Sequence, residues 1–355
     1  MQCGCSEGIC EICVTDYVGP LASRRPTQWQ CELLHSSRGH PFFAWKPVVT
    51  RINDELLGCV IYLYPSPECA SKGERVGGTG FILGIPTKNH PDMHWMYAVT
   101  NSHVIREGKS PVIRLNSVDG RTEVFPFTQD HWVHHPNGDD VAICLLSGLT
   151  KSRHDWIAVP DNMLISREHI IEHNIGPGED VVMVGRFISH DGRQRNTPSV
   201  RFGNISMMPG EPVRNRQRGI DQESFLVETR SLSGYSGSPV FTIQPRPPRG
   251  TFLLKDEKRE RMPDFLVGVD WGHLPVTEPV LDKHGAKLPD GWRVDSNSGQ
   301  MAVVPAWKIR ELLDSDPFVT QRDVGERALE RLKKMGAIPD DTSTNIDIAD
   351  GPPTG

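Results

Sequence analysis

Short apolar segments separated by turn residues constrain the fold of this chain more than any other feature. They are rich in valine, isoleucine and aromatic residues, and glycine, proline, asparagine or aspartate stands at their ends. This pattern is typical of β-strands, and none of the segments is long enough for an ordinary helix. The segments form one set before residue 153 and one after it: 58–65, 77–85, 95–101, 111–116 and 140–146, then 180–187, 199–207, 224–229, 238–243, 265–272 and 301–307.

The two sets of segments predict an all-β protein with two lobes. Their spacing suits antiparallel sheets arranged as a sandwich or a barrel. A chain of 355 residues is long enough to bury a core in each lobe.

The two ends of the chain differ from the strand-rich middle. Residues 1–46 contain four cysteines followed by polar sequence, and we expect them to form a separate N-terminal extension. Helical patterns appear at 305–314 and at 322–336, where the second ends at a glycine. The last nineteen residues carry four acids and no base, so we expect them to be disordered.

Composition excludes several classes of function. The net charge of −6 gives no support to a nucleic-acid partner or an anionic membrane surface. No apolar run is long enough to span a bilayer, and the N-terminus lacks the basic and apolar regions of a signal peptide. Eight cysteines in 355 residues do not make a disulfide scaffold. We therefore expect a cytoplasmic protein with reduced thiols, and the sequence does not indicate its oligomeric state.

Three separated segments offer a serine, a histidine and an acid. The serine hydroxyl of Ser236 in GYSGSP is a poor nucleophile unless a base takes its proton and an acid orients that base. VTNSHVI supplies His103 at the end of an apolar segment, and DDVAICLL supplies Asp140 at the start of another. Asp139 is the alternative acid, and its other interpretation is a solvated turn residue. The order along the chain is histidine, acid, serine.

These segments resemble the trypsin-like (chymotrypsin-fold) serine peptidases, in the form found in their bacterial branch. TNSHV is similar to the family's Thr-x-x-His segment, DVAICLL to its Asp-x-Ala-x-x-Leu strand, and GYSGSP to Gly-x-Ser-Gly-x-Pro. VDWGH at 269–273 is similar to the Val-Ser-Trp-Gly strand that pairs with substrate. The α/β-hydrolases use a different order, with serine before acid and histidine. The resemblance covers about residues 50–315.

The resemblance implies a fold of two antiparallel six-stranded β-barrels with short C-terminal helices. The first barrel is expected over residues 47–155 and the second over 156–315. A helical and disordered tail is expected over 316–355.

The resemblance also implies a serine endopeptidase that acts on protein or peptide substrates without a cofactor. Ser236 is expected to attack the scissile carbonyl while His103 moves the proton and Asp140 orients the imidazole. The backbone N–H groups of Gly234 and Ser236 are expected to form the oxyanion hole.

Substrate contacts follow from the same resemblance. Asp270, Trp271 and Gly272 are expected to bind an extended peptide as an added strand. Arg230, six residues before the serine, is expected at the base of the specificity pocket, where it would favour an acidic substrate side chain.

Two residues depart from the family pattern. Tyr235 stands where the digestive branch has an aspartate that pairs with a newly cut N-terminus, so activation by that route is not expected. Asp270 stands where the family has a serine beside the acid of the triad. Two neighbouring carboxylates raise one pKa or force one side chain outward.

The N-terminal cysteines have two interpretations. Cys3, Cys5, Cys10 and Cys13 follow a C-x-C-x4-C-x2-C spacing. Four thiolates can hold a structural zinc ion, although a C-x-C pair is shorter than the usual zinc-binding pairs. The other interpretation is a Cys-rich tail without metal.

The main alternative function is a catalytically silent member of the same fold that binds peptides or proteins. A zinc-dependent nucleic-acid binder is a further alternative, which the acidic net charge disfavours.

Overall fold

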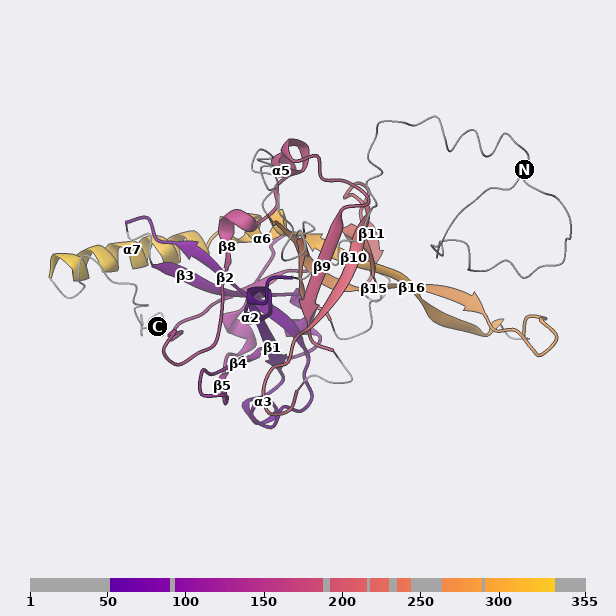
Figure 1. Cartoon of the computed structure of the whole chain (residues 1–355), viewed down its shortest axis with the longest axis horizontal. Helices are drawn as coiled ribbons and strands as arrows, with labels where there is room; N and C mark the ends of the chain where they lie inside the picture. The colour runs from indigo at the N-terminus through magenta and orange to yellow at the C-terminus, as the bar shows by residue number, and fades with distance from the viewer. Residues whose placement is uncertain are drawn as a thin grey trace, which may run out of the picture. The chain divides into compact units, whose positions relative to one another are not determined.

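Strands dominate the part of the chain that the structure describes. This structure is a computed structural model, and it describes residues 52–89, 93–187, 192–215, 218–229, 235–243, 264–288 and 291–335 (Figure 1). All of them belong to one unit that begins at Val48. The predicted N-terminal extension with its four cysteines lies outside the described residues, as does the tail after residue 335.

The first lobe is an eight-stranded sheet. Its path runs β5-β4-β1-β2-β3-β7-β6, and β8 joins β2 in parallel. All other pairs in this sheet are antiparallel. The strands are β1 (Val60–Tyr64), β2 (Gly78–Pro86), β3 (His94–Thr100), β4 (Val112–Asn116), β5 (Thr122–Phe125), β6 (Val133–His134), β7 (Ala142–Leu145) and β8 (Val159–Pro160).

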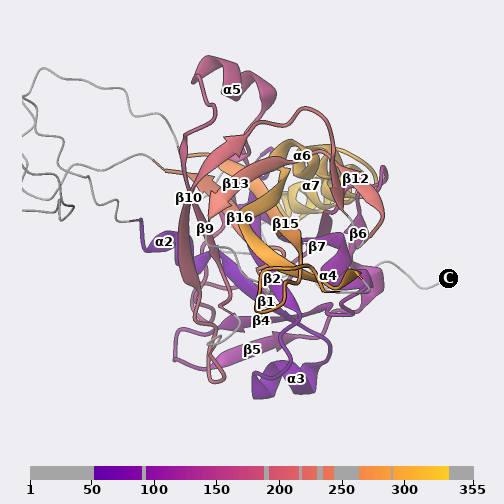
Figure 2. The same cartoon turned by 90° about the vertical axis from the view of Figure 1, so that its right-hand side faces the viewer.

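The second lobe is a closed barrel in the order β10-β13-β16-β15-β14-β9. In Figure 2 its strands β10, β13 and β16 lie above β1, β2, β4 and β5 of the first lobe. A separate two-stranded hairpin, β11–β12, precedes β13. The strands are β9 (Asp180–Gly185), β10 (Ser199–Met207), β11 (Val213–Asn215), β12 (Ile220–Gln222), β13 (Phe225–Thr229), β14 (Pro239–Thr242), β15 (Leu266–Pro279) and β16 (Arg293–Pro305).

The predicted all-β class and the six-stranded second barrel are confirmed, whereas the first lobe is an eight-stranded sheet with one parallel pair rather than the predicted six-stranded antiparallel barrel. The burial of β1 explains why this strand reads as a continuous apolar run. Successive side chains of a strand point to opposite faces of the sheet. Ile61 and Leu63 pack in one hydrophobic cluster, which contains only first-lobe residues. Tyr62 and Tyr64 belong to a second hydrophobic cluster, which also contains buried side chains from the strands of the barrel. Both faces are therefore buried, one inside the first lobe and one toward the second.

Two helices end the described chain, as predicted. The first, α6 (Ala306–Leu313), matches the expected segment. The second, α7 (Phe318–Lys334), begins four residues earlier than predicted. Its first residue, Phe318, packs edge-on against the Tyr97 ring at 5.4 Å between centroids, so a tertiary contact extends the helix beyond its own periodic pattern.

Four short helices were not predicted: α2 (Glu55–Gly58), α3 (Pro67–Lys72), α4 (Ser102–Arg106) and α5 (Arg167–Glu172). Local capping explains two of them. The Ser66 hydroxyl accepts a hydrogen bond from the Cys69 N–H at the start of α3, and Ser166 caps α5 in the same way through His169. Among the described residues, no helix has the length and apolar character needed to cross a membrane.

Helix α7 docks on the first lobe beside β3 (Figure 1). Glu326 Oε1 accepts hydrogen bonds from the indole of Trp95 at 3.2 Å and from the Lys88 N–H at 3.0 Å. Gly325 lets the helix approach closely, because a Cβ at this position would lie 2.0 Å from the Trp95 ring. The C-terminal helix is thus a packed part of the domain.

The substitution Gly325→Ala tests this contact. Alanine favours a helix over glycine by about 1 kcal/mol, but overpacking against an aromatic ring typically costs about 1–3 kcal/mol. We expect the free energy of unfolding, measured by urea denaturation, to fall. Val324→Ala, at an exposed position on the same helix, should change it little. A more stable Gly325→Ala protein would contradict the close packing of α7.

Candidate active site

His103 lies on α4, directly after the buried strand β3. The hydroxyl of Thr100, the last residue of β3, donates to the Thr79 carbonyl at 2.7 Å. The side-chain amide of Asn101 donates to the Asp140 carbonyl at 2.9 Å. These two bonds tie the end of β3 to its neighbours, and the short helix that follows carries the imidazole to a partly exposed position.

His103 binds both oxygens of Asp140. Its ring Nδ1 lies 2.7 Å from Oδ2, and its backbone N–H donates to Oδ1 at 2.9 Å. An ionised carboxylate only accepts hydrogen bonds, so this contact assigns the ring proton to Nδ1 and leaves Nε2 as the free acceptor. The structure thus pairs His103 with Asp140, whereas the alternative acid Asp139 contacts other side chains.

Asp140 is buried and charged. Its side chain is 1% exposed. Burial by itself raises the pKa of Asp140, but the hydrogen bonds and charge of His103, together with the charge of Arg218, outweigh that effect. The pKa of Asp140 therefore lies below its ordinary value, and the carboxylate is available to stabilise a protonated imidazole.

Ser236 lies in a tight turn between the lobes. Its carbonyl accepts a hydrogen bond from the Thr79 N–H of β2 at 2.9 Å. Gly237 has a φ of +90°, and a Cβ there would lie 1.7 Å from the Thr79 carbonyl oxygen, so only glycine fits. Thr79 therefore links two segments: its N–H binds the serine turn, and its carbonyl binds the end of β3.

The histidine and serine segments adjoin at Gly78. A Cβ on this residue would lie 2.7 Å from the Val104 side chain and 3.3 Å from the Ser236 carbonyl oxygen. Within the described parts of the chain, however, no hydrogen bond joins the Ser236 hydroxyl to the His103 imidazole. The structure brings the two segments together without forming the bond that would transfer a proton.

Tyr235 takes a structural place next to the serine. Its side chain is buried, and its hydroxyl lies 3.0 Å from the Ser199 hydroxyl and accepts from the Arg201 guanidinium at 3.0 Å. Both partners are on β10. The residue that replaces the family's aspartate thus anchors the serine turn to the barrel.

The backbone of Asp270 is already bonded to the serine turn, because its N–H donates to the Ser238 carbonyl at 2.9 Å and its carbonyl accepts from the Gly237 N–H at 2.8 Å. β14 pairs with β15 only as far as Val269, whereas β16 pairs with β15 as far as Pro279. The Trp271 indole is turned inward and donates to the Ser224 hydroxyl at 3.0 Å. The Asp270 backbone therefore has no free group for an added strand, and peptide pairing along Trp271 and Gly272 stays a prediction.

Asp270 is an acid held in a site that disfavours its charge. It is 1% exposed, and its Oδ1 accepts from the Gly272 N–H at 3.0 Å. Burial raises the pKa of Asp270 to about 7, and the Gly272 N–H and the charge of His103 only partly oppose this. Burial, rather than a nearby carboxylate, is the main cause of the raised pKa.

Two predicted site residues, Arg230 and Gly234, lie outside the described residues. The specificity pocket and the first oxyanion donor therefore stay predictions. The same is true of the N-terminal zinc site.

A polar network that no sequence motif indicates lies behind Asp140. Gln222 on β12 accepts from the Asp140 N–H at 2.8 Å and donates to Asp139 Oδ1 at 2.7 Å. Asp139 Oδ2 also lies 3.0 Å from the ring of the buried His135 and 3.2 Å from Lys308 on α6. Gln222 and Lys308 are far from residues 135–140 along the chain and share no motif with them, so no sequence signal connects them.

His135, Asp139 and Glu311 have the residue types and spacing of a metal site. Lys308 already supplies a cation there, because its ammonium group lies 3.2 Å from both carboxylates. Burial lowers the pKa of Lys308, but the two carboxylates outweigh burial and raise it. We therefore interpret the cluster as an ion-pair network.

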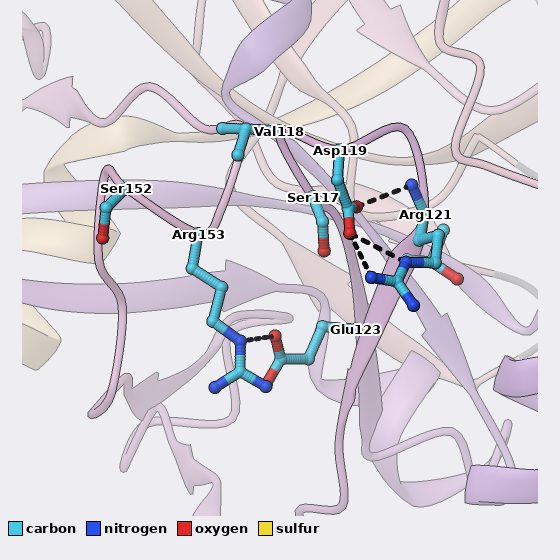
Figure 3. Close-up of a pocket in the computed structure, with 8 residues that line it drawn as sticks. Ser117, Val118, Asp119, Arg121, Glu123, Ser152 and Arg153 are labelled. Atoms are coloured by element: carbon cyan, nitrogen blue, oxygen red, sulfur yellow. Dashed lines mark hydrogen bonds and ion pairs between the residues drawn. The ribbon is translucent and has the colours of Figure 1, made fainter.

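A surface pocket of about 410 Å³ lies at the turn between β4 and β5 (Figure 3). None of the predicted site residues lines it. Its two arginines are paired within the pocket, Arg121 with Asp119 at 2.7 Å and Arg153 with Glu123 at 2.8 Å. The pocket is therefore separate from the candidate site and has its positive charges already balanced.

The raised pKa of Asp270 predicts a pH-dependent stability. An aspartate in the unfolded chain titrates near 3.8, whereas Asp270 in the folded chain titrates near 7. Between these values the folded state holds the extra proton, so its stability falls as pH rises from about 4 to about 7. Asp270→Asn removes this loss. We expect the variant to match wild type near pH 4 and to exceed it above pH 7, by at most about 4 kcal/mol.

Urea unfolding at several pH values measures this difference. Asp130→Asn removes an exposed acid and serves as the control. Parallel stability curves for Asp270→Asn and wild type would contradict the buried, neutral state of Asp270.

Comparison with known proteins identifies the domain. The profile of the trypsin-like peptidase domain matches residues 78–246, a range that contains His103, Asp140 and Ser236. No curated protein matches the chain.

Among solved structures, the MamO protease domain of Magnetospirillum magneticum is 15% identical with a TM-score of 0.40, and the match covers 74% of this chain and 100% of that one. The Rv3671c protease of M. tuberculosis, in an inactive form, is 14% identical with a TM-score of 0.38, over 73% of this chain and 88% of that one. Residues 78–246, together with the all-β fold, are thus similar to the trypsin-like peptidase domain.

Proposed function

We propose that the protein is a serine endopeptidase in which Ser236 is the nucleophile, His103 the general base and Asp140 the orienting acid. The observation that carries the proposal is the 2.7 Å contact between His103 Nδ1 and a buried carboxylate. This contact leaves Nε2 unprotonated and gives a positive imidazolium a partner when it forms. The family of the domain supports protein or peptide substrates.

The proposed reaction is acyl transfer to the serine followed by hydrolysis. Ser236 attacks the scissile carbonyl as His103 Nε2 takes its proton, and the imidazolium then returns the proton to the leaving amine. In the second half, His103 takes a proton from a water molecule that attacks the acyl-enzyme carbonyl, and it then returns the proton to Ser236 as the ester bond breaks and the acid product leaves. The backbone N–H groups of Gly234 and Ser236 are the proposed oxyanion donors, each worth about 3–4 kcal/mol to the transition state. No metal or cofactor takes part.

The absence of a Ser236–His103 hydrogen bond in the described chain is compatible with this mechanism. Catalytic hydrogen bonds are often long or misaligned without substrate and tighten when it binds. The backbone of the serine turn is held by Thr79 on one side and by the Asp270 carbonyl, which accepts from the Gly237 N–H at 2.8 Å, on the other.

An active-site probe tests the nucleophile. We expect a fluorophosphonate to label wild type and to fail on Ser236→Ala, and we expect His103→Ala to slow labelling by about 1000-fold or more. Ser238→Ala is the matched control, because its buried hydroxyl has no hydrogen-bond partner among the described residues and its removal should leave labelling intact. A folded wild type that resists the probe would favour the silent peptide-binding alternative.

The preferred cleavage site tests the proposed role of Arg230. A guanidinium at the base of the pocket attracts a carboxylate, so we expect a peptide library to show glutamate or aspartate before the cut. Arg230→Ala should lose that preference while Ser236 still reacts with the probe. A hydrophobic preference in wild type would remove Arg230 from the pocket.

A further inference from the structure

We propose that Arg218, on the β11–β12 hairpin of the second lobe, is a positioning residue that holds Asp140 in the orientation His103 requires. This inference rests on the proposed function and adds a residue to its machinery. It identifies a contact between the lobes on which the geometry of the base depends.

The hairpin presents Arg218 at a defined place. The Asn215 side chain accepts from the Arg218 N–H at 3.0 Å, and the Asn215 carbonyl accepts from the Gly219 N–H at 2.8 Å. These bonds shape the described part of the turn between β11 and β12. The base of the arginine side chain is therefore anchored before the guanidinium reaches the first lobe.

The guanidinium binds the oxygen of Asp140 that the His103 ring does not use. Arg218 Nη1 lies 2.9 Å from Oδ1 in an ion pair without hydrogen-bond alignment, and Oδ1 also accepts the backbone N–H of His103. Oδ2 is left to the ring nitrogen. With Oδ1 held from two sides, the carboxylate cannot rotate about its own axis without breaking an ion pair in a buried site, and Oδ2 stays directed at the imidazole.

Two further contacts support the arrangement. Glu107, just after α4, lies 3.3 Å from Arg218 Nε and holds the other side of the guanidinium, whose side chain is only 18% exposed. Gln222, on the same hairpin, accepts a hydrogen bond from the Asp140 N–H. The hairpin therefore binds both the side chain and the backbone of the acid. The ion pair of Arg218 with Asp140 is thus reinforced by a second contact from the same hairpin, the hydrogen bond to Gln222.

The charge of Arg218 acts on His103 as well as on Asp140. The guanidinium stabilises the ionised acid, and it also offsets part of the negative charge that an imidazolium would face. The other titratable and charged groups around the pair are Glu107, Arg106, His134 and Asp270. His134 stays uncharged at neutral pH because burial, assisted by Arg106, lowers its pKa to about 4. Loss of Arg218 therefore leaves the negative charge of Asp140 less offset, so that it stabilises a protonated His103 more strongly.

Arg218→Gln tests the proposal through kcat, KM and the pH profile of peptide hydrolysis. A less firmly oriented acid misplaces the base, so we expect kcat to fall by about 10- to 100-fold while KM changes little. The acidic limb of the kcat/KM profile should move to higher pH, because the imidazolium loses a nearby positive charge. Arg218→Lys should keep the limb near its wild-type position and restore part of kcat.

Arg214→Gln is the matched control on the same hairpin. Arg214 is exposed and pairs with Asp221 at 3.1 Å, so its loss should leave both the rate and the pH profile unchanged. A residue with only a structural role would lower stability without moving the limb. An Arg218→Gln protein that is less stable but has the wild-type kcat and pH profile would overturn the proposal.

A readout without catalysis separates this inference from the proposed function. The titration of the His103 ring, followed by nuclear magnetic resonance, should shift to higher pH in Arg218→Gln even in a Ser236→Ala background. If Arg218→Gln fails to fold, Arg218→Lys replaces it: its kcat should lie below that of wild type while the His103 titration stays near its wild-type position, and a wild-type kcat overturns the proposal. A protein that shows the shift but never hydrolyses peptides would contradict the proposed function and retain the positioning role.

Discussion

The buried carboxylate of Asp140 is the interaction on which the rest of the site depends. A charge removed from water without partners costs several kcal/mol, so its neighbours must supply hydrogen bonds and opposite charge. His103 supplies a ring nitrogen and a backbone N–H, and Arg218 supplies a guanidinium. These partners come from α4 and from the β11–β12 hairpin. One ionised side chain therefore brings together two segments that lie more than a hundred residues apart.

The fold makes this burial possible because the site lies where the two lobes meet. One face of β1 packs inside the first lobe, and the other belongs to a core shared with the barrel. Thr79 of β2 binds the serine turn with its N–H and the end of β3 with its carbonyl. The position of the nucleophile relative to the base thus follows from ordinary strand pairing together with a glycine that no larger residue can replace.

Local patterns in the sequence were sufficient to predict the long buried strands and the two C-terminal helices, and the family resemblance predicted the pairing of a histidine with an acid. Short strands such as β5, β6, β8, β11 and β12, and the exposed outer part of the β15–β16 hairpin, were not predicted because they bury few apolar side chains. The partners of the acid could not be predicted in the same way. Arg218 and Gln222 belong to a short hairpin whose sequence shows no catalytic motif, and their role appears only when the second lobe packs on the first. Likewise, the departure at Asp270 was visible, but its environment was not. The sequence suggested repulsion between carboxylates, whereas burial is the main cause of its raised pKa.

The proton position on His103 is the most direct test of this account. Nitrogen-15 chemical shifts of the neutral ring distinguish a proton on Nδ1 from one on Nε2. The contact with Asp140 predicts that the proton resides on Nδ1 in wild type, and that Asp140→Asn abolishes this preference. A neutral imidazole protonated on Nε2 in the wild-type protein would contradict the central claim, because that nitrogen could not then accept the proton of the serine.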